Sequence, residues 1–135
     1  MAPLPSKFDI TRPDIERVVA VFYAAVRAHP MLGPVFAVHI SDWPKHEAKV
    51  ANFWANAILY ERSYDGNPAQ VHQRAENVRP GMFESWLAVF DQTLQTELRP
   101  EQAAAWSALA HRIGGSLRAS VVDRDRLAGG IPKLR

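Results

Sequence analysis

Four polar aromatic side chains, Tyr23, His46, His72 and Trp86, lie on or beside stripes of apolar residues that repeat at helical spacing. Burying such groups costs free energy unless their polar atoms find partners. Because the four residues come from four separate segments, one shared partner would satisfy them together, and a planar metal cofactor between helices is such a partner. The sequence therefore indicates a cofactor site. The alternative is a cofactor-free helical scaffold in which these residues are only the polar edge of the core.

His72 is the strongest candidate for a metal ligand. It follows Pro68 in a short predicted helical segment and precedes a turn-rich stretch, which would aim the imidazole while leaving the backbone free to adjust. One such histidine holds the haem iron in globins and peroxidases. A lone histidine also occurs in purely structural positions, so the residue type alone does not decide between the two readings.

His46, Tyr23 and Trp86 would line the other side of such a cofactor. A neutral His46 could contact a ligand on the iron or be displaced by it, whereas the alternative is a boundary histidine near a helix N-terminus. Tyr23 offers a phenol O–H and Trp86 an indole N–H as hydrogen-bond donors. The histidines form no close helical pair and no Glu-x-x-His motif occurs, so a non-haem metal site fits the sequence less well.

The elements that must position these residues are all helices. Apolar periodicity predicts long helices over residues 11–28 and 42–60, one that opens at the turn before Met82, and one that opens at Pro100 and whose apolar stripe ends at Val121, before the Gly129-Gly130 tail. Thr11 is the expected N-cap of the first helix, and Ser41 and Asp42 are both candidate caps of the second. Each helix has an expected inner face. On the first helix it is Ile15, Val18, Val19, Phe22, Tyr23 and Val26, and on the second it is His46, Val50, Phe53 and Ala57. On the third helix it is Met82, Phe83, Trp86, Leu87, Phe90 and Leu94, and on the fourth it is Trp106, Leu109, Ala110, Ile113, Leu117 and Val121.

The connections between these helices are predicted to be short. Residues 29–40 should form a corner with one turn of helix, and residues 62–68 a loop before the segment that holds His72. We expect one all-α domain over residues 1–135, with its core over about 10–122 and a flexible tail over about 123–135.

Composition narrows the class of protein. The hydrophobic fraction is 47% and the charged fraction is 22%, as in soluble globular proteins. No apolar run approaches the roughly 18 residues that span a bilayer, and the N-terminus lacks a signal-peptide core. The absence of cysteine excludes disulfides, iron–sulfur ligation and thiolate haem ligation. We therefore expect a cytoplasmic protein without membrane insertion.

The charge distribution argues against nucleic acid as a partner. The formal net charge is +2, but residues 118–135 hold five of the 16 basic residues and two of the 14 acidic ones. The body of the chain is therefore slightly acidic. A nucleic-acid-binding domain would usually present a basic face instead.

Four segments carry a resemblance to a known family. The runs FYAAVRAHPMLGPVF (22–36), DWPKHEAKVANFW (42–54), AQVHQ (69–73) and MFESWLAVF (82–90) resemble the truncated haemoglobins, specifically their third group. The resemblance extends over about residues 10–120. It implies a shortened globin fold, in which two antiparallel helix pairs pack crosswise around a pocket for haem b. The single Gly33 and Gly66, in place of the glycine pairs of the first two groups, favour the third group.

The resemblance also implies roles for individual residues. His72 matches the proximal iron ligand, and the distal ligand pocket would contain Tyr23, His46, Trp86, Val50 and Phe36. Further cofactor contacts are expected from the positions of apolar and basic residues in the matching segments. They are Phe36 at the corner, Lys49, Val50, Phe53 and Trp54 on the second long helix, and Phe83 on the third. Arg74 and Arg79 are expected as propionate partners from their charge alone.

Three functions stay open at this point. The first is reversible binding of dioxygen, or of nitric oxide or carbon monoxide, at a five-coordinate iron. The second is a redox enzyme with peroxidase-like or nitric oxide dioxygenase-like activity, in which donors stabilise developing charge on oxygen. The sequence has no flavin or nicotinamide fingerprint, so a separate reductase would supply electrons. The third is the scaffold without a cofactor.

Overall fold

The computed structural model describes residues 7–61, 66, 68, 71–72 and 78–130. Within these residues the regular elements are all helices. They are α1 (Arg12–Ala28), α2 (Leu32–His39), α3 (Trp43–Leu59), α5 (Met82–Glu97) and α6 (Pro100–Gly130). Pro68, Val71 and His72 also have helical backbone, as expected for the short segment between α3 and α5.

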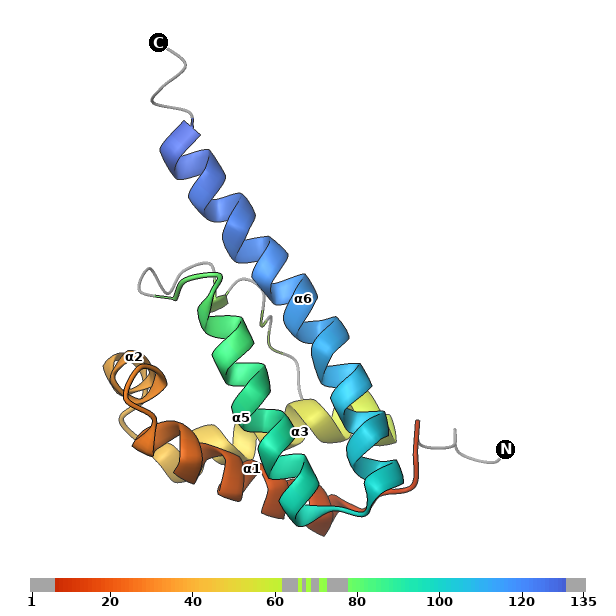
Figure 1. The fold of residues 1–135 in the computed structure, drawn as a ribbon. Coiled ribbons are helices and arrows are strands. Elements are labelled where there is room, and N and C mark those ends of the chain that lie inside the picture. Colours follow the sequence, from red (N-terminus) through yellow and green to blue (C-terminus); the bar gives the residue numbers. More distant parts are fainter. Residues whose placement is uncertain (1–6, 62–65, 67, 69–70, 73–77, 131–135) are drawn as a thin grey trace.

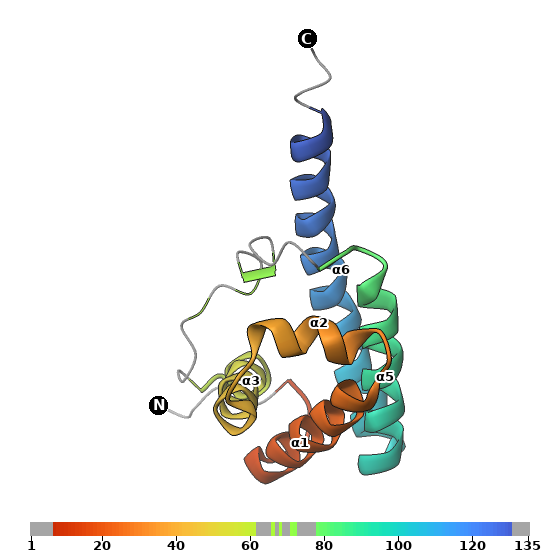
Figure 2. The ribbon, with the colours of Figure 1, turned by 90° about the vertical axis from the view of Figure 1, so that its left-hand side faces the viewer.

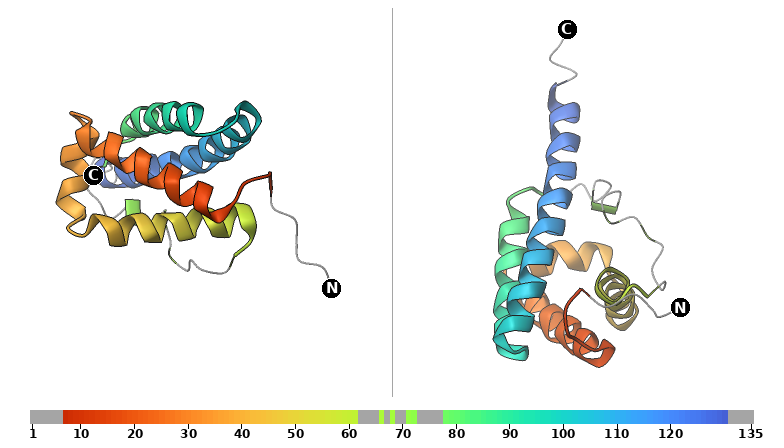
Figure 3. Two further views of the ribbon diagram at one scale, coloured as in Figure 1. Left: turned by 90° about the horizontal axis from the view of Figure 1, so that it is seen from below. Right: turned by 90° about the vertical axis from the view of Figure 1, so that its right-hand side faces the viewer.

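The helices form two antiparallel pairs that cross each other. Figure 1 shows α1 and α3 running across the molecule and α5 and α6 running along it. The left view of Figure 3 shows α1 beside α3, with α5 on the opposite side of α1. Contacts between α1 and α5 join the pairs, and α2 packs on both α1 and α5. The all-α, crosswise arrangement predicted from the sequence is confirmed.

Helix α1 follows the sequence prediction closely. Thr11 forms a capping box with Asp14: the Asp14 N–H donates to Thr11 Oγ1 at 3.3 Å, and the Thr11 N–H donates to Asp14 Oδ2 at 3.1 Å. All six residues of its expected inner face are buried. The apolar period alone therefore fixed which side of this helix packs inward.

Helix α3 buries a face different from the one expected. Asp42 caps it through a bond from the Lys45 N–H at 3.1 Å, and the helix ends before Tyr60, which has a left-handed φ of 61°. The buried residues are Ala51, Trp54, Ala55 and Ile58. The expected set, His46, Val50, Phe53 and Ala57, lies beside that face and is only partly buried. Protein therefore covers the first face completely and leaves the second one incompletely covered.

The corner between α1 and α3 contains more helix than the single turn expected. Helix α2 has eight residues, and the chain bends by 108° between α1 and α2. The His29 imidazole stabilises the start, because its Nδ1 accepts the N–H groups of Met31 and Leu32 at 3.1 Å each. Figure 2 shows α2 running from the end of α1 to the start of α3.

Helix α6 is longer than predicted. It continues to Gly130, whereas the sequence led us to expect a tail from about residue 123. The outer part of α6, towards its C-terminal end, extends past α1, α2, α3 and α5 in Figure 1. Val121 is nonetheless fully buried, so packing extends close to the predicted boundary.

Membrane-spanning potential is limited in the described residues. No single helix there combines the length and apolar composition needed to cross a bilayer, and only the bent pair α1 and α2 meets those criteria when taken together.

Gly33 is required at the corner because α2 approaches the end of α1 closely. A Cβ atom at this position would lie 2.7 Å from the carbonyl oxygen of Arg27. We expect Gly33→Ala to lower the free energy of unfolding by about 1–3 kcal/mol, the usual cost of an overpacked contact. Urea denaturation measures this change.

Gly115 on α6 supplies the matched control. A Cβ atom there would meet nothing within 4 Å. Gly115→Ala should therefore raise the free energy of unfolding by roughly 0.5–1 kcal/mol, because glycine weakens a helix interior. Equal effects of the two substitutions would contradict the close approach at Gly33.

Candidate haem site

Tyr23 and His46 meet at the centre of an aromatic cluster. Their ring centroids are 5.0 Å apart, with the rings nearly perpendicular at 83°. Phe36 of α2 and Trp43 of α3 pack on Tyr23 with centroid distances of 6.0 and 6.1 Å. Tyr23 is only 4% exposed. Three helices thus bring three of the predicted distal residues, Tyr23, His46 and Phe36, together.

Trp86 joins this cluster through Phe22 rather than by direct contact with Tyr23. Phe22 lies edge-on to Trp86 at 5.4 Å and to Tyr23 at 5.0 Å. On its other side Trp86 stacks on Phe90, with centroids 5.5 Å apart and planes 5° from parallel. The indole is therefore held in place on two sides, while the residue as a whole stays partly buried.

His72 is held by its own segment. Its Nδ1 lies 2.6 Å from the carbonyl oxygen of Pro68. A carbonyl can only accept, so Nδ1 must carry the proton and Nε2 keeps its lone pair. This arrangement is typical of metal-bound histidines, in which a second hydrogen bond fixes the tautomer and orients the ring. Phe83 of α5 packs against the imidazole, with ring centroids 5.6 Å apart.

Burial determines the charge states of these groups. It lowers the pKa of His72, although the bond to Pro68 acts in the opposite direction. Burial, and then the charge of Lys49, lowers the pKa of His46. Burial and the nearby Glu47 raise the pKa of the Tyr23 hydroxyl. Both imidazoles are thus favoured in the neutral form, and the phenol keeps its proton.

His46 Nε2 is an unsatisfied polar atom. It is buried, and no hydrogen-bond partner reaches it among the residues that the structure describes. Such an atom costs free energy comparable to a lost hydrogen bond. A bound ligand beside Tyr23 and His46 would supply the missing partner.

The predicted wall residues fall into two groups. Phe36, Val50 and Phe53 are partly buried and pack on the edge of the core. Trp54 is 2% exposed and stacks on Phe90 at 5.5 Å, with an edge contact to Trp106 at the same distance. In its described contacts Trp54 is a core residue, and its role at the haem edge stays a prediction.

The predicted basic contacts are the least defined. Lys49 and Arg79 are exposed, and the Arg79 backbone N–H donates to the sulfur of Met82 at 3.4 Å. Arg74 lies outside the described residues. Within the described part of the chain, no ring contact joins His72 to Tyr23 or His46, so the proximal and distal candidates form two separate groups.

Two residues of the site were not singled out by their sequence pattern. Trp43 packs on both Tyr23 and His46, and the Arg27 guanidinium lies over its ring at 4.7 Å from the centroid. Its position three residues before His46, on the same helix face, was a usable signal. Phe22 was assigned only to the core, yet its ring links Tyr23 to Trp86.

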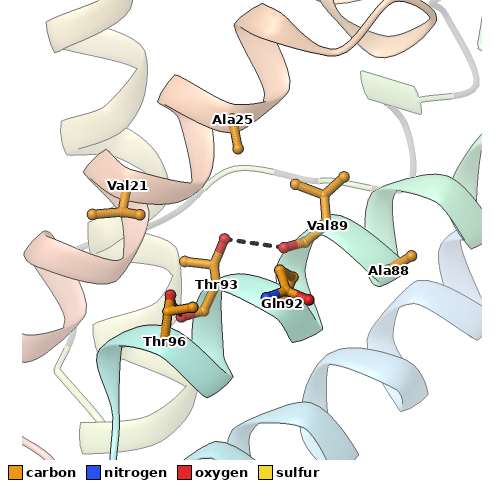
Figure 4. Close-up of a pocket in the computed structure, with 7 residues that line it drawn as sticks. All are labelled: Val21, Ala25, Ala88, Val89, Gln92, Thr93 and Thr96. Carbon is orange, nitrogen blue, oxygen red and sulfur yellow. Dashed lines mark hydrogen bonds between the residues drawn. The ribbon is translucent and has the colours of Figure 1, made fainter.

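A groove elsewhere on the molecule does not coincide with this site. Figure 4 shows it between α1 and α5, with a volume of about 450 Å³. Its lining residues are Val21, Ala25, Ala88, Val89, Gln92, Thr93 and Thr96. The Thr93 hydroxyl donates to the Val89 carbonyl within the same helix at 3.0 Å. None of the predicted site residues lines this groove.

The fold is that of a truncated globin. A crystal structure of a group III truncated haemoglobin from Campylobacter jejuni superposes with a TM-score of 0.80 and 30% sequence identity, over 87% of this chain and 95% of that one. In sequence, the chain is 38% identical over 93 residues to a group 3 truncated haemoglobin of Campylobacter jejuni, covering 65% of this chain and 73% of the relative. No family model matches the chain.

The chain belongs to the group 3 truncated haemoglobins and is a globin-type haem protein. The residues present fit that cofactor. The Nδ1 bond of His72 leaves its Nε2 with a lone pair that could bind iron, and Phe36, Val50 and Phe53 form an apolar surface that protein covers only in part. His46 Nε2 is buried without a described partner on the same side as Tyr23.

The lowered pKa of His46 predicts a pH-dependent stability of the haem-free protein. Between the folded pKa and the ordinary value of 6.5, the unfolded chain binds more protons than the folded one. The contribution of neutral His46 to the free energy of unfolding should therefore be complete above pH 6.5, and it should decline as the pH falls from 6.5 towards the pKa of His46 in the folded protein. His46→Gln should flatten the decline, as measured by urea unfolding over a pH series. Identical pH profiles of the two proteins would contradict the burial of a neutral His46.

Proposed function

We propose that this protein reversibly binds dioxygen at the iron of a haem b that His72 holds as its proximal ligand. When bound, the haem supplies an iron centre that accepts a diatomic ligand on its open side. The proposal is supported above all by the hydrogen bond from His72 Nδ1 to the Pro68 carbonyl, which leaves Nε2 as a neutral donor atom.

The chain's lack of cysteine supports a haem that is held without covalent attachment, as haem b is. Thioether attachment, as in c-type haems, requires cysteine side chains, and the sequence contains none. Axial ligation plus apolar contacts would therefore hold the cofactor. Phe83 beside His72, and Val50 and Phe53 on the incompletely covered face of α3, are the apolar contacts that we assign to it.

On the distal side, Tyr23 is the principal hydrogen-bond donor to the gas ligand. Its hydroxyl keeps its proton because burial raises its pKa, so it can donate over the physiological pH range. Phe36 and Trp43 hold the phenol ring from two sides. Such a preorganised donor binds partly negative oxygen without rearranging first. Trp86, fixed between Phe22 and Phe90, is the second donor in this proposal.

His46 has a different role in the proposal. His46 as a whole is only partly buried, but its Nε2 atom is buried and has no hydrogen-bond partner among the described residues. The imidazole is therefore not tied to one orientation by a bond at Nε2. We assign it to gating, in which it turns between a position that occludes the ligand site and one that opens it.

The assignment of His72 predicts a spectroscopic change. His72→Gly should abolish the proximal-histidine absorption spectra of the ferric, ferrous and carbon monoxide forms, and added imidazole should restore them. His111→Gln is the control, because His111 pairs with Asp91 on the surface at 2.7 Å. An unchanged spectrum in His72→Gly would remove His72 from the proposal.

The assignment of Tyr23 predicts a kinetic change. Tyr23→Phe should speed dioxygen dissociation by about 10- to 150-fold, since a hydrogen bond to a charged acceptor is worth roughly 1.5–3 kcal/mol. Stopped-flow measurement of the off-rate tests this expectation. Tyr60→Phe is the control, as Tyr60 is 42% exposed at the end of α3. A wild-type off-rate in Tyr23→Phe would exclude Tyr23 as the donor.

A further inference from the structure

Arg124 on the outer part of α6 is an unusually buried cation. Its side chain is only 17% exposed, although arginine side chains are mostly exposed. One turn earlier on the same helix, Val121 is fully buried. Arg124 therefore continues the inward stripe of α6 beyond Val121. Figure 1 shows that the C-terminal part of this helix extends past the other helices.

The guanidinium binds backbone atoms on both sides of the stretch that follows His72. Its Nη2 donates to the Val78 carbonyl at 2.8 Å, and its Nη1 approaches the His72 carbonyl at 3.4 Å. Asp125 accepts from Nε at 2.9 Å and lies 2.7 Å from Nη2. The Arg124 side chain thus contacts the backbone of His72, the proposed iron ligand, and the backbone of Val78, six residues further along the chain.

These contacts suit arginine and not lysine. The planar guanidinium presents several N–H donors in fixed directions, so it can bind two carbonyls and a carboxylate at once. A lysine ammonium is a compact charge on a flexible stem and cannot reproduce that fork. The Asp125 carboxylate offsets the cost of placing the charge in a partly buried site.

We propose that Arg124 is a positioning residue for the iron ligand: from α6 it fixes the backbone of His72, while the Pro68 carbonyl fixes the ring. This inference rests on the proposed function, in which His72 holds the iron. The two constraints act on different atoms of one residue, Nδ1 of the side chain and O of the main chain. Hydrogen bonds from the surrounding protein to a ligand residue set the orientation of that ligand and the affinity for the metal.

The test compares Arg124→Met, which keeps most of the apolar stem, with Arg124→Lys, which keeps the charge. Arg126→Met is the matched control, because Arg126 is 74% exposed and pairs with Asp123 within one turn of the same helix. The first readout is the iron–histidine stretching band of the ferrous haem-loaded protein in resonance Raman spectra. The second is hydrogen exchange of the peptide containing His72 in the haem-free protein.

We expect Arg124→Met to shift and broaden the iron–histidine band and to speed haem dissociation about tenfold or more, as loss of charge-assisted bonds implies. Exchange at the His72 peptide should rise by a similar factor. Arg124→Lys should fall between wild type and Arg124→Met, and Arg126→Met should match wild type. If Arg124→Met does not fold, Arg124→Lys against Arg126→Met decides the question with the same readouts.

The outcomes separate this inference from the function on which it rests. A band that disappears in His72→Gly but is unchanged in both Arg124 variants, with wild-type hydrogen exchange, would overturn the role of Arg124 and leave the proposed function standing. A wild-type protein without any His72-dependent band would overturn both.

Discussion

Helix α1 packs against α2, α3 and α5, and its buried stripe is the constraint on which the rest of the structure depends. Neighbouring residues on that stripe have different tasks. Phe22 packs on Phe90 in the core, whereas Tyr23 points into the cluster with His46. Because Phe22 also contacts Trp86, the two proposed donors, Tyr23 and Trp86, are supported by the same ring that packs at the crossing of the two helix pairs. Core packing therefore sets the positions of the proposed distal side chains.

The two faces of α3 differ in how far protein covers them, and only the incompletely covered face is part of the proposed haem site. Ala51, Ala55 and Ile58 are buried against protein and stabilise the domain without any cofactor. The adjacent face, with His46 and Val50, is only partly covered. A haem that covers this second face would add apolar burial to the folded state only, and binding to the folded state alone stabilises it by mass action.

The sequence predicted most of the fold because its local patterns are unambiguous. The period of the apolar residues identified the buried side of α1, and Thr11 was a recognisable cap. For α3 the sequence offered Ser41 and Asp42, and the structure shows that Asp42 is the cap. The period could not choose between the two faces of α3, since both are apolar and only tertiary packing decides which one meets protein.

The extent of α6 was missed for a similar reason: the charged run before Gly129 resembles a solvated tail, and the buried contacts of Arg124 are long-range. Their places on apolar stripes made Tyr23, His46 and Trp86 candidates, and the resemblance to the family then assigned them to the distal side. Trp43 and the capping role of His29 became visible only through contacts.

The contacts of Arg124 also limit how α6 can vary in length. Successive residues of an α-helix are turned by about 100° around the axis. Inserting or deleting one residue between Trp106 and Arg124 would keep the core half in place and swing the guanidinium away from the His72 and Val78 carbonyls. Changes beyond Arg126 carry no such penalty. The outer half of this helix should therefore tolerate substitutions on its exposed side, while the number of residues up to Arg124 stays fixed.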